Sequence, residues 1–568
     1  MAETKREIER KYESDESGLP DLTGVGEIER VLDRGVAELD ATYYDTADGR
    51  LAAASITLRR RTGGSDAGWH LKFPVSPGVR DEVRAPLSAG LPRSLAGLVR
   101  SRVRDAELVP VVRLRSARDV RELVDGEGRL LAEVSVDAVR AERLSGGDGA
   151  AQWSEIEVEL ADGADPVLLD QVEKRLRKAG VRRSASESKL ARALAETSGT
   201  GTGAAKSPGK QAKSAGPASS AKSGKADKGA KASGKVGKSG KVEKSSGKAG
   251  EPVPSAEPVS SAGPGETPGA TPGRTPAHHT AAHHVLAYLS AQRDAIVALD
   301  PAVRQDEFDS VHRMRVATRR ARSAFRSFGK VLDRAVTDPI GEELKWLAGE
   351  LGVDRDQEVL AERITGGLEK LPRHLVVGPV RTRLRTWSHA RRGGSRRRLI
   401  AVLDGRRYLA LLDTLDALIA GPPLLKAASG EPEKVIAAAV RKDFARVAAL
   451  IEEALAQPSS GPERDFALHE ARKKAKRTRY SAEAAQSALG DPATAMVKVA
   501  RSLQNLLGDH QDSVMAREAL REIAGQAHAA GESGFTYGLL YGREERRSAD
   551  DEAELPGLWE RVKGGTGI

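Results

Sequence analysis

The sequence predicts a multidomain protein of the α+β class, in which a strand-rich N-terminal domain and an all-α C-terminal domain flank a low-complexity linker. Three observations predict this organisation. Through residues 1–197, polar and apolar residues alternate with the period of β-strands, with modest helical pieces between them. Residues 198–276 consist mainly of Ala, Gly, Lys, Ser and Pro. From residue 277 to about 563, apolar residues recur at helical spacing between Gly and Pro breaks.

The linker carries the excess charge of the chain. Twelve lysines stand against two acidic residues between Gly199 and Gly250, a charge of +10, and the formal net charge of all 568 residues is also +10. The linker offers too little apolar surface to offset chain entropy, which predicts a disordered basic segment. Anion-binding surfaces in the two folded domains must therefore arise from the local arrangement of charge.

Other features of the composition restrict the chemistry. The chain has no cysteine, which excludes disulfides, thiolate nucleophiles and Cys-ligated zinc. The N-terminus lacks the apolar segment of a signal peptide, and no run approaches the ~18 consecutive apolar residues that span a bilayer. We therefore expect a cytoplasmic protein without a membrane partner.

Charged residues share one face of the first predicted strand. Lys5, Glu7, Glu9 and Lys11 have one parity, and successive side chains of a strand point to opposite faces. The same segregation recurs at Arg59 and Arg61, at His70 and Lys72, at Arg80, Glu82 and Arg84, at Glu133 and Asp137, and at Glu155, Glu157 and Glu159. A solvated sheet face explains one such strand. Rows of one sign on several strands would repel one another on an open face, so we favour a barrel with a charged lumen.

A lumen with both signs of charge suits phosphoryl chemistry. Carboxylates can hold Mg²⁺ or Mn²⁺, which prefer oxygen ligands, and Arg and Lys side chains can hold phosphate oxygens. Phosphoryl transfer to water needs both, because metal ions neutralise developing charge while fixed cations hold the phosphate chain in line.

The motif Glu7-x-Glu9-x-Lys11 resembles the ExExK signature of CYTH domains, the triphosphate tunnel metalloenzymes. Further motifs follow in the order of that family over residues 3–195: Tyr43-Tyr44-Asp45-Thr46, Leu58-Arg59-Arg60-Arg61, Leu71-Lys72-Phe73-Pro74, the acidic row at 155–159, and Ser188-Lys189. The resemblance implies an eight-stranded antiparallel β-tunnel with helices, in which Glu7, Glu9 and Lys11 are catalytic.

The resemblance also implies ligand-binding roles. Glu7, Glu9 and a glutamate of the row Glu155, Glu157 and Glu159 would hold Mg²⁺ or Mn²⁺. The phosphates would be held by Lys11, Arg59, Arg61, Lys72, Arg84 and Lys189. On the strand from Pro110, alternation places Arg113 and Arg115 on one face, whereas the family pattern points equally to Arg118 on the other. One of these assignments therefore requires a β-bulge.

The helical part contains an internal repeat. Residues 311–322 recur as residues 468–479 at an offset of 157, and residues 344–356 recur as residues 500–512 at an offset of 156. Two copies of one helical unit are therefore predicted, at about 280–410 and 430–560.

Each copy opens with a helix that carries a row of cations along a stripe about 80° wide, at ~100° per residue. The rows are His312, Arg315, Arg319, Arg322 and Arg326 in the first copy, and His469, Arg472, Lys476 and Arg479 in the second, where Glu483 replaces the fifth cation. The opposite sides are apolar, with Met314, Ala317, Ala321, Phe325 and Phe328 in the first copy and Ala471, Ala475, Ala482 and Ala485 in the second. A solvated helix face normally mixes charges in i,i+4 pairs, so a repeated row of cations favours an anion site.

Both opening helices resemble the start of the CHAD domain, a helical family named for its histidines, and Leu351-Gly-x-Asp-Arg-Asp356 with Leu507-Gly-Asp-His510 agrees with its later pattern. The resemblance spans about residues 280–560 and implies two pseudo-symmetric helical bundles that bind polyphosphate along basic grooves. We interpret the histidines as hydrogen-bond donors to phosphate, because their cationic neighbours would repel a metal. Glu483 should weaken that end of the second groove.

These patterns predict a divalent-metal-dependent hydrolase of inorganic triphosphate or a related polyphosphate or organic triphosphate, joined to a polyphosphate-binding module. The alternative is a non-catalytic polyphosphate-binding or granule-associated protein, in which both domains seize polyphosphate. A third interpretation makes the linker a nucleic-acid arm, but its lysine-rich segment has no aromatic residue and no arginine to read bases. We therefore expect the linker to lend nonspecific attraction to polyanions, and polyphosphate granules are a candidate location.

Overall fold

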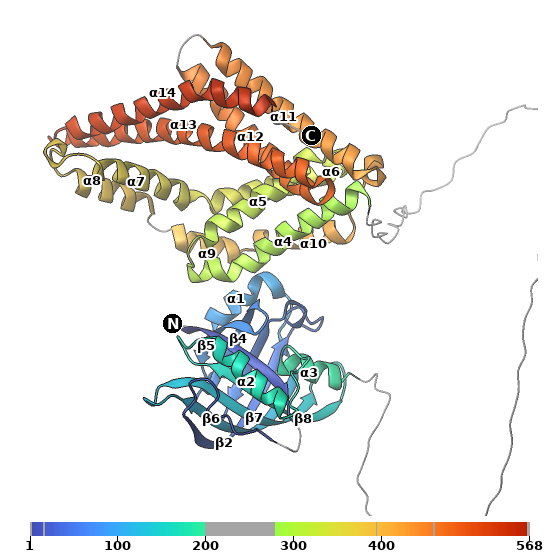
Figure 1. Cartoon of the computed structure of the whole chain (residues 1–568). Coiled ribbons are helices and arrows are strands. Elements are labelled where there is room, and N and C mark those ends of the chain that lie inside the picture. The colour runs from blue at the N-terminus through green and yellow to red at the C-terminus, as the bar shows by residue number, and fades with distance from the viewer. Residues whose placement is uncertain (1–2, 15–17, 199–278, 393–394, 458–460, 565–568) are drawn as a thin grey trace, which may run out of the picture. The chain divides into compact units, whose positions relative to one another are not determined.

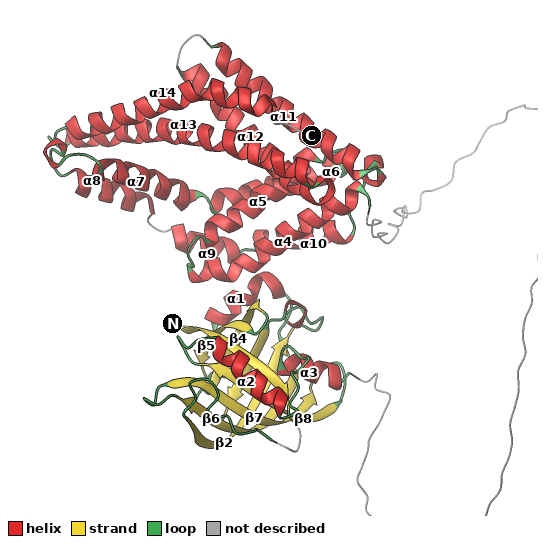
Figure 2. Cartoon of the chain, viewed as in Figure 1, coloured by secondary structure: helices red, strands yellow, loops and turns green. Residues whose placement is uncertain are grey.

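The computed structural model describes residues 3–14, 18–198, 279–392, 395–457 and 461–564 (Figure 1). An N-terminal domain of strands with short helices and a C-terminal domain of helices confirm the predicted α+β class (Figure 2). The predicted linker, except for its first residue, falls outside the described residues. Every helix in the described ranges is too short or too polar to cross a bilayer.

Eight strands form the N-terminal domain, and all their pairings are antiparallel. Their order in space is β1-β5-β4-β3-β2-β6-β7-β8, and β8 pairs with β1 to close the ring. The predicted eight-stranded antiparallel tunnel is therefore confirmed. The strands are β1 Glu3–Glu13, β2 Arg30–Asp45, β3 Thr57–Thr62, β4 Gly68–Ser76, β5 Val79–Pro86, β6 Val109–Val124, β7 Leu130–Arg143 and β8 Ala150–Leu160.

Many apolar side chains of the barrel point outward and are covered by helices. Ile156 and Val158 of β8, for example, pack with Val172 and Leu176 in one buried cluster. Because strand side chains alternate, this outer cover turns the charged residues of the same strands into the lumen. The helices are α1 Arg93–Val103, α2 Val167–Lys178 and α3 Lys189–Glu196, and a 3₁₀ turn spans Ala52–Ala54.

The C-terminal domain is helical throughout its described residues, apart from connecting turns and loops. Its helices are α4 Ala281–Gln305, α5 Ser310–Ser327, α6 Arg334–Glu350, α7 Val353–Glu369, α8 Val380–Arg392, α9 Ser395–Asp404, α10 Arg406–Ala420, α11 Pro432–Ala456, α12 Pro462–Leu489, α13 Asp491–Ala529 and α14 Phe535–Gly564, with 3₁₀ turns at Arg373–Leu375 and Lys426–Ser429.

The repeated segments occupy matching elements. The first cation row lies on α5 and the second on α12. The second repeated segment differs in form, because α6 and α7 are separate helices that meet at Leu351 and Gly352, whereas the equivalent Leu507 and Gly508 lie inside the continuous α13.

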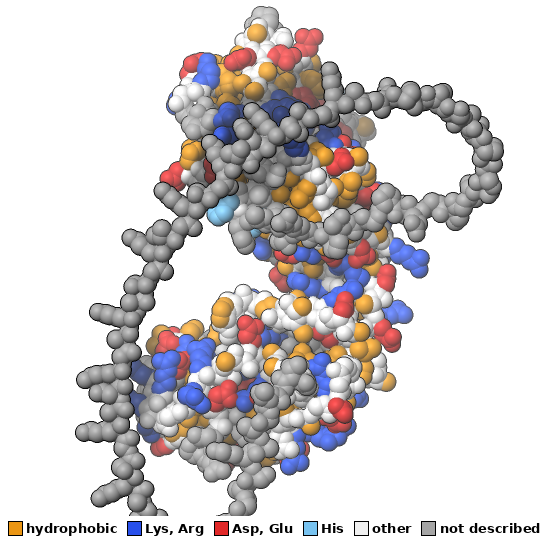
Figure 3. Space-filling model, turned by 90° about the vertical axis from the view of Figure 1, so that its right-hand side faces the viewer, with side chains coloured by type: hydrophobic (Ala, Val, Ile, Leu, Met, Phe, Trp, Pro, Cys, Tyr) orange, Lys and Arg blue, Asp and Glu red, His pale blue; other side chains and the backbone are white. Residues whose placement is uncertain are grey.

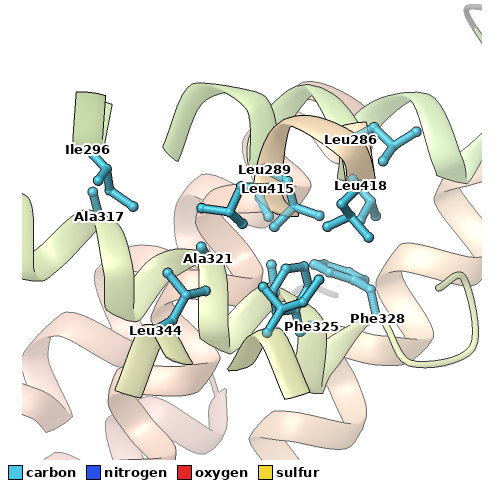
Figure 4. Close-up of a cluster of buried hydrophobic side chains, with 14 of the residues drawn as sticks. Leu286, Leu289, Ile296, Ala317, Ala321, Phe325, Phe328, Leu344, Leu415 and Leu418 are labelled. Carbon is cyan, nitrogen blue, oxygen red and sulfur yellow. The ribbon is translucent and has the colours of Figure 1, made fainter. Parts of the chain in front are cut away.

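The apolar side of α5 faces the largest buried cluster of the helical domain. Ala317, Ala321 and Phe325 lie with Leu289 of α4 and Leu344 of α6 in this core (Figure 4). All nine side chains predicted for the apolar sides of α5 and α12 are buried: Met314, Ala317, Ala321, Phe325, Phe328, Ala471, Ala475, Ala482 and Ala485. This packing leaves the cation rows on the opposite sides of both helices.

Candidate functional site

The barrel encloses a cavity of about 530 Å³ whose wall is charged. Most of the predicted site residues of the N-terminal domain line it: Glu7, Glu9, Lys11, Arg59, Arg61, Lys72, Arg84, Arg118, Glu157, Glu159 and Lys189. The closed ring thus brings together side chains that lie up to 182 residues apart in the sequence. Several of these side chains form two ion-pair clusters, and both clusters include residues of strand β1.

The first cluster joins β1, β4 and β5. The ammonium of Lys72 lies 2.5 Å from Glu7 and 3.5 Å from Glu82, which is directly opposite it in the β4–β5 register. Arg84 lies 3.4 Å from Glu7 and also pairs with Glu82. Two carboxylates with almost no solvent exposure are therefore held by a lysine and an arginine that face the lumen.

The two carboxylates of this cluster have divergent proton affinities. Burial raises the pKa of Glu7 to about 7, although the charge of Lys72 opposes this shift. Burial acts in the same direction on Glu82, but a hydrogen bond from His70 and the charge of Lys72 hold its pKa well below the usual range. Glu7 is thus partly protonated near neutral pH, and a divalent cation beside it would favour its ionised form.

The second cluster joins β1 and β8. The ammonium of Lys11 lies 3.0 Å from Glu9 and also pairs with Glu157, its neighbour in the β1–β8 register. Burial would raise the pKa of Glu157, but the charges of Lys11 and Lys189 hold it well below its ordinary value. The carboxylate of Glu157 therefore stays ionised in the lumen.

Lys189, the first residue of α3, extends this cluster to β7. Its ammonium lies 2.6 Å from Glu155, 2.6 Å from Glu157 and 2.9 Å from Asp137. Arg118 reaches the same acids, with 2.7 Å to Asp137 and 2.6 Å to Glu157. One oxygen from each of the three acids lies within 4.8 Å of the others.

The donor set of the lumen fits a divalent metal ion. Glu7, Glu9 and Glu157 offer only carboxylate oxygens, which are the ligands that Mg²⁺ and Mn²⁺ prefer. Acidic groups that could bind a metal are also present at Asp137 and Glu155, beside Glu157. Lys11 pairs with Glu9, and Lys189 pairs with Glu157. These carboxylates therefore already stabilise positively charged groups in the lumen.

Cations of the two rows in the helical domain have acidic neighbours: Glu342 lies 3.8 Å from Arg322 and 3.5 Å from Arg326, and Glu483 lies 3.4 Å from Arg479. Over much of the outer surface in Figure 3, Lys and Arg side chains stand among Asp and Glu side chains. On α12, Arg472 lies 3.5 Å from Asp512. Burial and the charges of Arg472 and Arg319 lower the pKa of Lys476 to about 7. The two rows therefore influence each other electrostatically, since Arg319 belongs to α5.

A third charged group lies at the junction of α12, α13 and α14. The imidazole Nε2 of His510 lies 3.3 Å from Asp465 and 3.3 Å from Glu552. Arg464 and Arg517 pair with the same two carboxylates, at 3.2 and 3.7 Å. These arginines neutralise the acids, so we interpret the group as an internal salt-bridge network.

The CYTH family model matches residues 5–194, and the CHAD family model matches residues 287–521. The chain belongs to the CYTH and CHAD domain families. Two uncharacterized proteins of Mycobacterium tuberculosis, from strains CDC 1551 and H37Rv, are similar to this chain over nearly their whole length. Each is 37% identical to this chain over 581 residues, which cover 98% of this chain and 97% of the relative.

Several solved structures resemble parts of this chain. PptA from Streptomyces chartreusis is 19% identical and covers 50% of this chain and 99% of its own, with a TM-score of 0.43. The CHAD domain of the plant Ricinus communis is 25% identical and covers 51% of this chain and 97% of its own, with a TM-score of 0.38. A Hippeastrum protein with a dominant triphosphatase activity is 20% identical and covers 33% of this chain and 95% of its own, with a TM-score of 0.21.

The structure shows which arginines of strand β6 in the CYTH domain face the lumen. Arg118 faces the lumen, whereas Arg113 and Arg115 lie on the outer face, where both pair with Asp40. The prediction that Arg113 and Arg115 hold phosphate in the tunnel is therefore corrected. The physical reason is that β6 pairs with β7 without a register shift from Val112 to Leu123, so positions of opposite parity stay on opposite faces.

Sequence reasoning also missed residues of the CYTH lumen. Glu82 and Asp137 are fully buried and each pairs with at least two cations, yet neither was assigned a role. Their parity with other charged residues was visible, but parity does not show which strands become neighbours. Arg80 and Asp66 also line the cavity.

In the CHAD domain, the predicted rows lie on the non-core sides of α5 and α12. Arg315, Arg319 and Arg322 are half-buried and His312 is exposed. His469, Arg472, Lys476 and Arg479 are half-buried, and His469 Nδ1 lies 2.5 Å from the amide oxygen of Gln511. The rows were predicted without Arg320 and Arg477, which connect α5 and α12.

Proposed function

We propose that this protein is a Mg²⁺- or Mn²⁺-dependent hydrolase of inorganic triphosphate, or of a related polyphosphate or organic triphosphate, with a CHAD domain that binds polyphosphate. The observation that carries the proposal is the lumen of about 530 Å³ in which Glu7, Glu9 and Glu157 stand beside Lys11, Lys72 and Arg118. We place the activity in the cytoplasm, with polyphosphate granules as a possible site of action.

In this proposal, Glu7, Glu9 and a glutamate of the 155–159 row hold the metal, which neutralises phosphate charge and polarises the scissile bond. Arg59, Arg61, Lys72 and Arg84 hold the phosphate oxygens on the β3–β5 side of the lumen. Arg118 and Lys189 hold them on the β6–β8 side. One water adds across a P–O–P bond, so each turnover yields two shorter phosphates.

The test is phosphate release by the full chain from triphosphate, a nucleoside triphosphate and polyphosphate, with Mg²⁺, with Mn²⁺ and with a chelator. We expect metal-dependent release, and a loss of at least about 100-fold in Glu9→Gln, because a carboxylate ligand is replaced by a neutral amide. Arg113→Gln, on the outer face, is the matched control and should keep wild-type activity.

The same assay separates the alternative. If the protein binds polyphosphate tightly and releases no product from any of the three substrates, the non-catalytic interpretation replaces the hydrolase. The ion pairs that already neutralise most lumen carboxylates are the observation that favours this alternative, because a binding lumen needs only cations for its ligand.

A further inference from the structure

The two cation rows of the CHAD domain differ where the repeat relates Arg326 to Glu483. In the second copy, Glu483 accepts a hydrogen bond of 2.8 Å from Arg320 of α5 and lies 3.4 Å from Arg479 of its own helix. This end of the contact between α5 and α12 is therefore neutralised by a carboxylate.

The pseudo-symmetric end has the opposite character. The repeat relates Arg320 to Arg477. Arg320 of the first copy contacts Glu483 of the second, and the equivalent Arg477 of the second copy contacts Arg326 of the first. Because residue 326 is an arginine where the second copy has Glu483, Arg477 Nη2 donates to its backbone oxygen at 2.7 Å. The Arg326 side chain itself lies 3.5 Å from Glu342 of α6. Asp443 of α11 compensates in part, at 3.1 Å from Arg477 and 3.3 Å from Arg446. Two arginines thus converge at this end, where the other end has an ion pair.

A cavity of about 450 Å³ opens at this convergence. Its arginines come from four helices: Arg322 and Arg326 from α5, Arg334 from α6, Arg446 from α11 and Arg477 from α12. Two acids in the wall, Asp338 and Glu342, and Asp443 behind it leave an excess of two positive charges. Asp338 pairs with Arg334 at 2.7 Å. Glu342 is shared among Lys345 at 2.9 Å, Arg326 at 3.5 Å and Arg322 at 3.8 Å.

Arg322 is the least satisfied cation of this cavity. Its Nε is buried and has no hydrogen-bond partner among the described residues, and its nearest carboxylate, Glu342, lies 3.8 Å away. Burial and the charge of Arg326 lower the pKa of Arg322, which shows that the site disfavours its own positive charges. An anion between the guanidinium groups would relieve both the repulsion and the missing hydrogen bond.

We propose that this cavity is a phosphate-binding subsite that continues the groove of the first repeat and has no counterpart at Glu483. The inference rests on the proposed polyphosphate binding of the CHAD domain. Arg322 and Arg326 belong to both the row and the cavity, so a phosphate chain that follows α5 leads into the subsite. Polyphosphate would then bind asymmetrically in a pseudo-symmetric domain.

The test uses the full chain and polyphosphate of defined length, with affinity measured by titration calorimetry over a range of salt concentrations. The informative variants are Arg446→Gln, which lies in neither row, and Arg326→Glu, which copies the charge of the second repeat. We expect each to weaken binding by about five- to tenfold and to lower the slope of log affinity against log salt by about 1, because fewer phosphates are neutralised. Arg546→Glu on α14, whose side chain is 80% exposed, is the control and should bind like the wild type.

The outcomes are distinguishable. Wild-type affinity and salt slope in both informative variants, with a large loss in the row variant Arg319→Gln, would overturn the subsite and leave polyphosphate binding standing. If the wild-type chain binds no polyphosphate, the proposed function of the CHAD domain fails as well as the subsite. Titration with pyrophosphate separates two sources of the ligand. If Arg446→Gln weakens the binding of pyrophosphate, free short phosphates enter the subsite. If Arg446→Gln weakens the binding of long polyphosphate alone, the subsite serves the polymer.

Discussion

The ammonium of Lys11 lies 3.0 Å from a carboxylate oxygen of Glu9, two positions earlier on the inner face of β1. The same ammonium pairs with Glu157 across the β1–β8 register. The lysine of the motif therefore joins two carboxylates that we propose as metal ligands. A metal ion at these oxygens would compete with Lys11, because both are cations that seek the same acceptors.

This relationship predicts opposite effects of Lys11→Ala on metal binding and on turnover. Removing the competing cation leaves Glu9 and Glu157 facing the lumen without their shared partner, so affinity for Mn²⁺ should rise several-fold. Hydrolysis should fall by at least about tenfold, because Lys11 is also a proposed phosphate contact. Mn²⁺ titration calorimetry and phosphate release measure the two effects. Weaker Mn²⁺ binding in Lys11→Ala would show that the lysine supports the metal site and does not compete with it.

The two faces of β6 predict a contrast between two arginines. Arg118→Gln should raise the KM for triphosphate or lower kcat/KM by about 10–100-fold, because it removes a lumen cation and leaves Asp137 and Glu157 with fewer partners. Arg113→Gln removes only an outer pair with Asp40 and should leave kcat/KM unchanged. Equal losses in the two variants would contradict the assignment of faces. Thermal unfolding of both variants separates catalytic loss from misfolding.

Alternation along the chain was sufficient to place Glu7, Glu9 and Lys11 on one inner face, because the parity of a regular strand does not depend on its neighbours. It was not sufficient for Arg113 and Arg118, which lie on one strand with opposite parity. The choice between them depends on whether a bulge intervenes, and the pairing of β6 with β7 decides it. The residues of β6 alone do not show whether the strand contains a bulge.

The importance of Glu82 was hidden for a different reason. Its partners, His70 and Lys72, belong to the preceding strand, and the contacts depend on the register of the β4–β5 hairpin. In the CHAD domain, the internal repeat shows in the sequence alone that Glu483 stands where the first copy has Arg326. The consequence for Arg326 and Arg477 followed only from the packing of α5 against α12, which brings the two repeats together.

Gly352 predicts an asymmetry between the two rows. A methyl group at Gly352 would lie 2.8 Å from the guanidinium carbon of Arg315, whereas at the equivalent Gly508 the nearest atoms of Arg472 would be 3.6 Å away. Gly352→Ala should therefore displace Arg315 and weaken polyphosphate binding by about two- to fivefold, while Gly508→Ala should leave it unchanged. Gly352 has a φ of −96°, so alanine causes no backbone strain there. Titration of both variants with polyphosphate is the measurement, and a loss confined to Gly508→Ala would refute this account.

Lys476 predicts that polyphosphate binding weakens as pH rises. Burial and its arginine neighbours lower the pKa of Lys476 to about 7, so its charge is largely lost by about pH 8.5 in the free protein. A bound polyanion favours the protonated lysine, so binding takes up a proton in this range and affinity falls from pH 6.5 to 8.5.

The charged groups that face Lys476 are Arg472, Arg319, Arg315 and Asp512. The difference between the wild type and Lys476→Gln isolates the lysine, with Lys473→Gln as an exposed control that pairs with Glu470. In Lys476→Gln the fall in affinity above pH 7 should shrink, and the proton uptake measured in buffers of different ionisation enthalpy should drop.

In the ligand-free protein the unfolded chain keeps this proton up to about pH 10.5, so Lys476 makes the folded state more stable as pH rises above 7. Identical pH profiles for the wild type and Lys476→Gln would exclude a lysine that changes charge in the groove.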